Sequence, residues 1–395
     1  MNKELETSLQ SKQDSYHFTP IFFDLSLQED QRKVESLIKE GNIHITVDDF
    51  EEQHRELFGV KNPTKVYTLT YNDEFQKYYN DLTKKRSHIY CGKWVYFPWL
   101  SKLVHILDEE DFQLVRTARN KNLITADEQK KFYNTTVGIG GLSVGSSVAF
   151  ALVLQGGAKH IKLADMDKLA LSNTNRILMG VDNLGVYKVE MAARRIYEIN
   201  PYANVELFPE GLTEESLPRF FDGIDIVIDE LDNLAVKYLI REYAKKHGVP
   251  VVMAADNGDN AVVDIERYDL DKETPFFHGR MGEDVSYEQL LHLDKFGIGK
   301  MITKHVGSEN VTIRMQESLL EMGKTIVSWP QLGGAALING AAVAYCVRKI
   351  CNGQLLENNR TLISLDEKLL PNYHTQEEIQ KRAAASETFR NIFGL

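Results

Sequence analysis

The segment from Thr136 to Lys188 constrains the fold of this chain most strongly, because a glycine turn, an acidic pair and a polar loop follow one another within it. The turn reads V-G-I-G-G-L-S-V-G from Val137 to Gly145. Its apolar start predicts a buried strand over Thr135–Ile139, and the residues after it predict a helix over Ser143–Gln155. The first amides of a helix attract anions, so this arrangement predicts a phosphate site above the turn.

The glycines and the acidic pair together indicate a nucleotide. Gly138, Gly140 and Gly141 would let the backbone approach a phosphate closely. Asp165 and Asp167 follow the next expected strand and can accept hydrogen bonds from ribose hydroxyls. A glycine turn alone is also typical of any tight strand-to-helix connection, so simple packing is the competing interpretation.

The polar loop separates this pattern from that of a nicotinamide-binding unit. Such units run directly from the acidic strand into a helix, whereas here Asn173, Asn175 and Arg176 precede a helix that opens near Lys188. Two cations beside a phosphate site suit a reacting triphosphate better than a dinucleotide held at rest. A further apolar strand then ends in D-E-L-D-N, where the Asp232 carboxylate could hold a magnesium ion near the phosphates.

The order of these motifs resembles the adenylating domain shared by ubiquitin-activating enzymes and their bacterial relatives ThiF, MoeB, HesA and MccB. The motifs are, in order, G-x-G-G, D-x-D, S-N-x-N-R, a lysine and D-x-x-D-N. The resemblance covers about Arg116–Gly353. Arg119, in R-T-A-R-N, is similar to an arginine of this family that reaches into the partner's site in dimeric members. One departure is Ser143, which stands where the family has the last glycine of the turn.

The resemblance implies that ATP and a carboxylate combine to give an acyl adenylate and pyrophosphate. A carboxylate is already deprotonated at neutral pH, so the reaction needs charge compensation rather than a general base. By resemblance, Arg176 and Lys188 would hold the phosphates, Asp232 would place magnesium and Arg119 would add a further positive charge. For each residue the competing interpretation is a solvated surface ion.

The cysteines set limits on cofactors and intermediates. Cys91, Cys346 and Cys351 supply no C-x-x-C pair, so the structural zinc of many relatives is not expected. Relatives that form a thioester place a cysteine in or near the crossover after the sheet, and residues 256–330 contain none. The chain is therefore expected to hand the adenylate to another nucleophile.

The chain as a whole is expected to be an α/β protein. Residues 116–353 predict a doubly wound, Rossmann-like and mostly parallel sheet with a crossover at 256–330. Residues 1–115 predict a smaller α+β domain that is a candidate for docking a substrate or partner, and residues 354–395 a C-terminal extension.

Two groups of residues leave alternatives open. In the crossover, His278, Arg280 and His305 are either contacts for the acyl substrate or ordinary loop residues. The aromatic cluster between Tyr90 and Trp99 is either a peptide-docking surface or, as we favour, a core that packs against the second domain.

Composition excludes some classes of partner. The net charge of −11 argues against a broad nucleic-acid surface. There is no apolar run long enough to span a bilayer, and the polar start M-N-K-E-L-E-T lacks the apolar core of a signal peptide, so a cytoplasmic location is expected.

These observations favour a homodimeric enzyme that uses ATP and magnesium to adenylate a carboxylate on a carrier protein, a peptide or a small acid. One alternative is a cyclising dehydratase resembling the enzyme that closes threonylcarbamoyl-adenosine in transfer RNA, which has a similar turn and T-N-T-N-R loop. The acidity of this chain counts against it. Another alternative is a nucleotide-binding scaffold without turnover.

Overall fold

The computed structural model describes residues 17–84, 86–282 and 284–395. The polar first residues on which the signal-peptide argument rested lie outside this part. The chain forms two compact units. The first contains the described residues up to Ala126 together with Ala193–Tyr202, and the second contains Asp127–Ala192 and Ala203–Leu395. The predicted domain limits at 115 and 353 stay predictions.

The first unit is built on a four-stranded sheet in the order β1-β3-β4-β2, in which only β2 and β4 run parallel. Its strands are β1 (Ile21–Phe23), β2 (Ile45–Asp48), β3 (Lys93–Phe97) and β4 (Lys102–Ile106). Its helices are α2 (Gln28–Lys39), α3 (Phe50–Lys61), α4 (Tyr71–Lys84) and α5 (Glu109–Arg116), with 3-10 turns η1 (His88–Tyr90), η2 (Pro98–Leu100) and η3 (Ala118–Asn120).

The aromatic cluster supplies the core of this first unit. Trp94 and Tyr96 of β3 are buried and pack with Phe23, Val34 and Leu103. These side chains lie between the sheet and α2, which explains why so many aromatic residues occur within one short segment. Trp94 and Tyr96 are therefore core residues that pack within the first unit, and the expected packing against the second domain stays a prediction.

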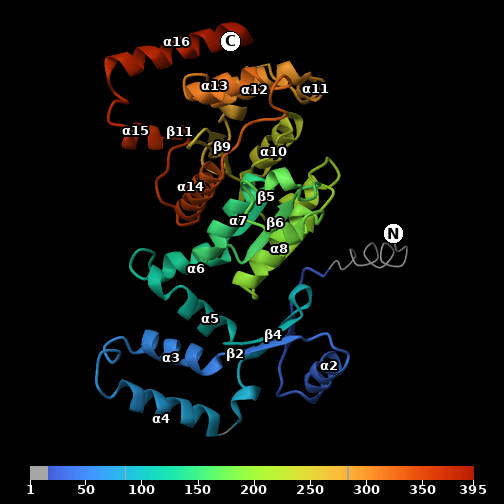
Figure 1. The fold of residues 1–395 in the computed structure, drawn as a ribbon, viewed down its shortest axis with the longest axis vertical. Coiled ribbons are helices and arrows are strands. Elements are labelled where there is room, and N and C mark those ends of the chain that lie inside the picture. The colour runs from blue at the N-terminus through green and yellow to red at the C-terminus, as the bar shows by residue number, and fades with distance from the viewer. Residues whose placement is uncertain (1–16, 85, 283) are drawn as a thin grey trace, which may run out of the picture. The chain divides into compact units, whose positions relative to one another are not determined.

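The second unit contains a seven-stranded sheet in the order β11-β10-β9-β8-β5-β6-β7. Figure 1 labels β5, β6, β9 and β11 of this sheet. Its strands are β5 (Thr136–Gly140), β6 (His160–Ala164), β7 (Asn204–Phe208), β8 (Ile226–Asp229), β9 (Val251–Asn257), β10 (Asn260–Glu266) and β11 (Arg360–Ile363). The strands from β9 to β7 are parallel, and β10 and β11 are antiparallel additions at one edge. The predicted α/β class and mostly parallel sheet are thereby confirmed.

In the parallel part of the second unit, helices alternate with strands along the chain, as a doubly wound sheet predicts. The helices are α6 (Ala126–Asn134), α7 (Val144–Leu154), α9 (Leu217–Phe221), α10 (Leu234–His247), α11 (Tyr287–Leu291), α12 (Lys295–Val306), α13 (Ile313–Leu320), α14 (Gly333–Cys351), α15 (Leu365–Leu369) and α16 (Gln376–Phe393). The 3-10 turns are η4 (Leu171–Asn173), η5 (Val181–Asn183) and η6 (Phe276–Gly279), and α8 (Lys188–Ile199) begins in this unit and ends in the first.

Strand alternation shows which helices cover which face of the sheet. On β9, Met253 faces Lys237 of α10, whereas Asp256 faces Asn339 of α14. Because neighbouring side chains of a strand point to opposite faces, α10 and α14 lie on opposite sides of the sheet. α14 also packs along α7, so α7 and α14 form one layer and α9 and α10 belong to the other.

The C-terminal extension belongs to the same unit. Phe389 of α16 is 1% exposed and packs with Val262 of β10, with Val306, and with Met315 of α13. The tail thus caps the antiparallel edge of the sheet. In the described residues no helix is long and apolar enough to cross a membrane.

Candidate active site

The glycine turn between β5 and α7 is held by backbone and carboxylate contacts. Gly141 has φ of 84°, a conformation that favours glycine, and its N–H donates to the Ala164 carbonyl at 2.8 Å. A Cβ atom on Gly141 would lie 2.3 Å from the carbonyl oxygen of Glu230, so no other residue fits. The Leu142 N–H donates to Oδ2 of Asp165 at 2.7 Å, which ties the turn to the end of β6.

Neighbouring side chains leave little space for a Cβ atom at Gly138 and Gly140. A Cβ atom on Gly138 would lie 2.4 Å from Ile224, and one on Gly140 would lie 3.2 Å from both Leu212 and Leu231. The space that these two glycines leave is thus filled by neighbouring side chains. Gly141 is the glycine whose backbone geometry requires it, and the approach of a phosphate to these three residues stays a prediction.

The two acidic residues after β6 differ in what they can still bind. Asp165 is 8% exposed, and its oxygens accept from the N–H groups of Leu142 and Asp167 and lie 3.4 Å from Nζ of Lys188. Asp167 lies 2.7 Å from the same ammonium, but its side chain is 66% exposed. Asp165 therefore positions the turn, and Asp167 has the free lone pairs that a ribose hydroxyl needs.

Lys188 is 6% exposed and opens α8 between these two carboxylates. Its backbone N–H also donates to the Asp167 carbonyl at 2.9 Å. Sequence reasoning placed this lysine beside phosphates, and the structure places it beside the acidic pair. Its contact with phosphate stays a prediction.

Arg176 is fixed at the start of α7. Its Nε donates to Oγ of Ser143 at 2.8 Å, and its Nη1 donates to Oδ1 of Asn175 at 2.9 Å and to the Ser172 carbonyl at 3.2 Å. The serine that departs from the family pattern therefore has a function here, because it aligns the guanidinium with the glycine turn. Partial burial lowers the pKa of Arg176, and the nearby Asp256 and Asp232 carboxylates oppose that shift.

The side chains of Asn173 and Asn175 form hydrogen bonds that hold the loop in place. Oδ1 of Asn173 accepts from the Ala170 N–H at 3.0 Å, which closes the turn η4. Nδ2 of Asn175 donates to the Gln331 carbonyl at 2.8 Å. The loop that carries Arg176 is thereby fastened to the segment before α14, and nucleotide contacts by Asn173 and Asn175 stay predictions.

Asp256, at the end of β9, is a residue of this site that sequence reasoning missed. It is 6% exposed and accepts from Nδ2 of Asn339 at 2.6 Å and from Nε2 of Gln331 at 3.1 Å. Burial raises the pKa of Asp256 to about 6, although both hydrogen bonds and Arg176 lower it. Its position in A-D-N-G after an apolar strand was a usable signal, whereas nothing local connects it with Gln331 or Asn339.

The acidic residues after β8 have three different environments. Asp229 is fully buried, with Lys237 at 3.1 Å and Arg241 at 2.6 Å, and therefore stabilises the fold. Glu230 accepts from the Ala254 N–H at 2.9 Å, and burial raises its pKa well above the usual value. Asp232 is exposed, and its role as a magnesium ligand stays a prediction.

The remaining cationic candidates divide between the two units. Arg119 is exposed in η3 of the first unit, and its role at the site stays a prediction. In the second unit, Arg280 and His278 lie 2.5 Å and 3.2 Å from the buried Asp264. His305 is 3% exposed, and burial lowers its pKa to about 3. His278, Arg280 and His305 thus belong to one internal network, which favours a structural role.

The model of the ThiF family matches residues 117–293. These residues, which are less than half of the chain, resemble the ThiF family. The match contains every residue predicted for the site from Arg119 to Asp232, together with the glycine turn, the acidic pair and the Arg176 loop described above. The resemblance drawn from the motifs is thereby confirmed.

Relatives of this ThiF domain carry different names. An uncharacterized protein of Mycobacterium tuberculosis is 39% identical over 277 residues, which are 70% of this chain and 38% of that protein. The tRNA threonylcarbamoyladenosine dehydratase of Escherichia coli is 37% identical over 31% of this chain and 45% of its own length. The sulfur carrier protein adenylyltransferase of Thermus thermophilus is 29% identical over 37% of this chain and 51% of its own length. The chain therefore spans 38% to 51% of these relatives.

Proposed function

We propose that this protein uses ATP to adenylate a carboxylate, giving an acyl adenylate and pyrophosphate. The observation that carries the proposal is Arg176, whose guanidinium is held by Ser143 at the first turn of α7. A cation and the amides of a helix start converge there, which suits a phosphate chain that gains negative charge during reaction. The name of the Thermus thermophilus relative, an adenylyltransferase, supports the same chemistry.

The reaction forms one bond and breaks another at the α-phosphate. An oxygen of the substrate carboxylate attacks the α-phosphorus in line, and the bond to the β-phosphate oxygen breaks, so that pyrophosphate leaves with the charge. Arg176 is oriented before the substrate arrives, since three acceptors already fix its guanidinium. Preorganised charge of this kind contributes more to the transition state than to the ground state.

Two exposed carboxylates would bind the ribose and the metal. Asp167 keeps free lone pairs and follows β6, where a ribose would lie beside the turn. Magnesium is usually bound by one or two carboxylates together with substrate phosphates, and the single exposed carboxylate of Asp232 fits this donor set. Such an ion would neutralise charge on the phosphates.

We infer that the acyl group passes directly to an external nucleophile. Cys346 is 5% exposed in α14, and burial raises its pKa to about 11, so its thiol stays protonated at neutral pH. A protonated thiol is a poor nucleophile. This supports transfer without a thioester on that residue.

The first test is nucleotide choice. We expect ATP with magnesium to bind and NAD not to bind, because the fastened loop from Ser172 to Arg176 occupies the path that a nicotinamide half would take. Isothermal titration of the full chain with each nucleotide measures this. Binding of NAD without binding of ATP would contradict the proposal and favour a dehydrogenase.

A second function has a specific observation in its favour. The 37% identity to the Escherichia coli tRNA threonylcarbamoyladenosine dehydratase supports a cyclising dehydratase that also begins with adenylation. The net charge of −11 opposes binding to RNA. Retention of the protein on immobilised transfer RNA at low salt would favour the dehydratase. No retention, together with adenylation of a protein or peptide fraction, would favour the first proposal.

A further inference from the structure

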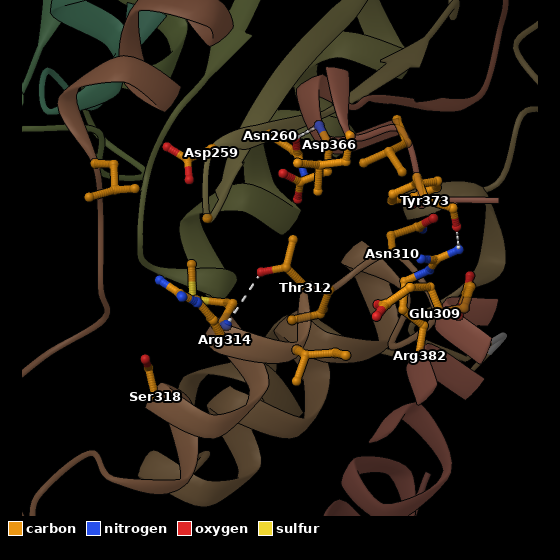
Figure 2. Close-up of a pocket in the computed structure, with 18 of the residues that line it drawn as sticks. Asp259, Asn260, Glu309, Asn310, Thr312, Arg314, Ser318, Asp366, Tyr373 and Arg382 are labelled. Atoms are coloured by element: carbon orange, nitrogen blue, oxygen red, sulfur yellow. Dashed lines mark hydrogen bonds between the residues drawn. The ribbon is translucent and has the colours of Figure 1, made fainter. Parts of the chain in front are cut away.

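A pocket lies at the carboxyl end of β9, on the other side of the segment that fastens the Arg176 loop. It has a volume of about 550 Å³ and is bordered by the β9–β10 hairpin, α13 and the C-terminal extension (Figure 2). We call it the hairpin pocket. Its volume falls within the range of ~300–1,000 Å³ that is typical of ligand sites.

The hairpin pocket shares a wall with the nucleotide loop. Pro330 and Leu332 line the pocket, while Gln331 between them bonds to Asn175 and Asp256. One short segment therefore separates the pocket from the loop that carries Arg176.

Charges of both signs border the pocket without ionic partners. Asp259, Asp366, Arg314 and Arg382 line it, and none of the four forms an ion pair with another residue in the described part of the chain. Figure 2 shows Asp259 and Arg314 on one side of the opening and Arg382 on the other. By contrast, two further carboxylates of the lining have ionic partners: Glu309 pairs with Arg360 at 2.9 Å and Glu378 with Lys381 at 3.6 Å.

These charged groups are held in place by polar contacts. Asp366 accepts from Nδ2 of Asn260 at 3.1 Å, and Asn260 is 3% exposed. Arg382 donates to the Tyr373 carbonyl at 2.8 Å and stacks on the Tyr373 ring at 3.8 Å. Four carboxylates and two guanidinium groups line this one cavity, and they suit a ligand that carries both a cation and an anion.

Apolar side chains line the same pocket. Val311, Met315, Leu332 and Leu362 face it together with the charged groups. A small acid with a single charge would leave most of these partners unused. A peptide segment offers apolar side chains, charges of both signs and backbone groups for Asn310 and Ser318 at once.

We propose that the hairpin pocket binds a peptide segment with charged residues of both signs, and that this segment leads the reacting carboxylate to the nucleotide. The proposal rests on the proposed function and narrows its substrate to the end of a peptide or carrier protein. Arg314, Asp366 and Arg382 lie beyond the residues matched to the ThiF family, so the selectivity comes from this chain's own crossover and extension.

The test uses four synthetic tetrapeptides with free carboxyl ends: Lys-Asp-Gly-Gly, Lys-Asn-Gly-Gly, Gln-Asp-Gly-Gly and Gln-Asn-Gly-Gly. Binding to the full chain is measured by calorimetry with ATP and magnesium present. We expect the doubly charged peptide to bind at least about tenfold more tightly than the neutral one, since one good ionic contact in a partly buried site is worth about that factor.

Substitutions in the pocket test whether its charged residues cause the preference for charged peptides. Asp259→Asn should reduce the preference for lysine, and Arg314→Gln should reduce the preference for aspartate. Glu317→Gln is the matched control, because Glu317 is exposed on the same helix as Arg314 but does not line the pocket. Thermal melts verify that each variant folds.

The outcomes separate this proposal from the previous one. Equal affinity for the four peptides, or preferences that survive both pocket variants, would overturn the hairpin pocket as a peptide site. If the charge preference is found without any ATP binding, the pocket stands as a peptide site, while the adenylation proposal fails and with it the role of the pocket in leading a carboxylate to the nucleotide. If ATP binds and no peptide is preferred, the pocket proposal fails and the adenylation proposal stands.

Discussion

At the scale of single residues, Arg176 and Lys188 looked equivalent in the sequence but have different surroundings. Arg176 has three hydrogen bonds to neutral acceptors, whereas Lys188 is buried between two carboxylates. Removing Lys188 would leave the buried carboxylate of Asp165 without its cation, which destabilises the fold as well as the site. Arg176 therefore offers the cleaner test of charge compensation.

We expect Arg176→Ala to lower pyrophosphate exchange by about a hundredfold, because loss of one preorganised charge costs ~3 kcal/mol in a transition state. Ser143→Ala should lower it by about tenfold, since the guanidinium keeps two of its three hydrogen bonds. Exchange is measured with ATP and the acid-containing fraction of a host extract. Arg219→Ala is the control, because Arg219 is exposed and pairs with Glu206 and Glu210. Equal losses in all three variants would contradict the assignment.

Asp256 predicts a dependence of stability on pH. Its pKa is raised to about 6 from an ordinary value of 3.8, so the native state holds its proton over a pH range in which the unfolded chain has lost it. Stability from this group is therefore complete below about pH 4 and is lost as pH rises through about 6. The shift corresponds to about 3 kcal/mol.

The matching variant is Asp256→Asn, which cannot ionise. Relative to the wild type, its free energy of unfolding should rise by up to about 3 kcal/mol between pH 4 and pH 7. Urea unfolding of both proteins at unit steps of pH measures the difference, in which the titration of other carboxylates cancels. A difference that stays constant with pH would show that Asp256 is ionised normally.

At the scale of elements, local patterns predicted the parallel core well. The helix expected to open near Lys188 matches the start of α8, and the helix expected over Ser143–Gln155 is longer than α7 by one residue at each end. Buried parallel strands and amphipathic helices leave signals within a few residues of sequence. The contacts of Asp256 with Gln331 and Asn339 span 75 and 83 residues, and no local signal predicts such partners.

The contact of α14 with α7 gives a test at this scale. A Cβ atom on Gly340 would lie 2.7 Å from the carbonyl oxygen of Ser147, whereas one on Gly334 meets nothing within 4 Å. Gly340→Ala should therefore destabilise the protein by about 1–3 kcal/mol through overpacking. Gly334→Ala should be neutral or stabilising by up to ~1 kcal/mol, because alanine favours helix. Thermal unfolding compares them, and equal effects would mean that α14 does not pack on α7 at Gly340.

At the scale of the whole molecule, the sequence predicted a ThiF-like domain and a separate N-terminal part that is a candidate for docking a substrate or partner. The first unit has its own aromatic core, and Arg119 belongs to it by position in the chain. The proposed homodimer draws support from α14, where Leu337 and Tyr345 are 50% and 47% exposed. Apolar side chains on one helix face are typical of a contact between subunits.

The last prediction concerns which subunit uses Arg119. If Arg119 acts in the site of a partner subunit, Arg119→Ala and Asp232→Ala dimers are each inactive, while a mixed dimer has one doubly altered site and one intact site. Mixing the two variants should then restore up to about a quarter of wild-type pyrophosphate exchange, because about half of the dimers are mixed and each has one working site of two. Sedimentation velocity first establishes the dimer, and differently tagged chains confirm that subunits exchange. If Arg119 acts within its own chain, every site in the mixture carries a substitution. Exchange of subunits without recovery of activity would therefore rule out the crossed arrangement.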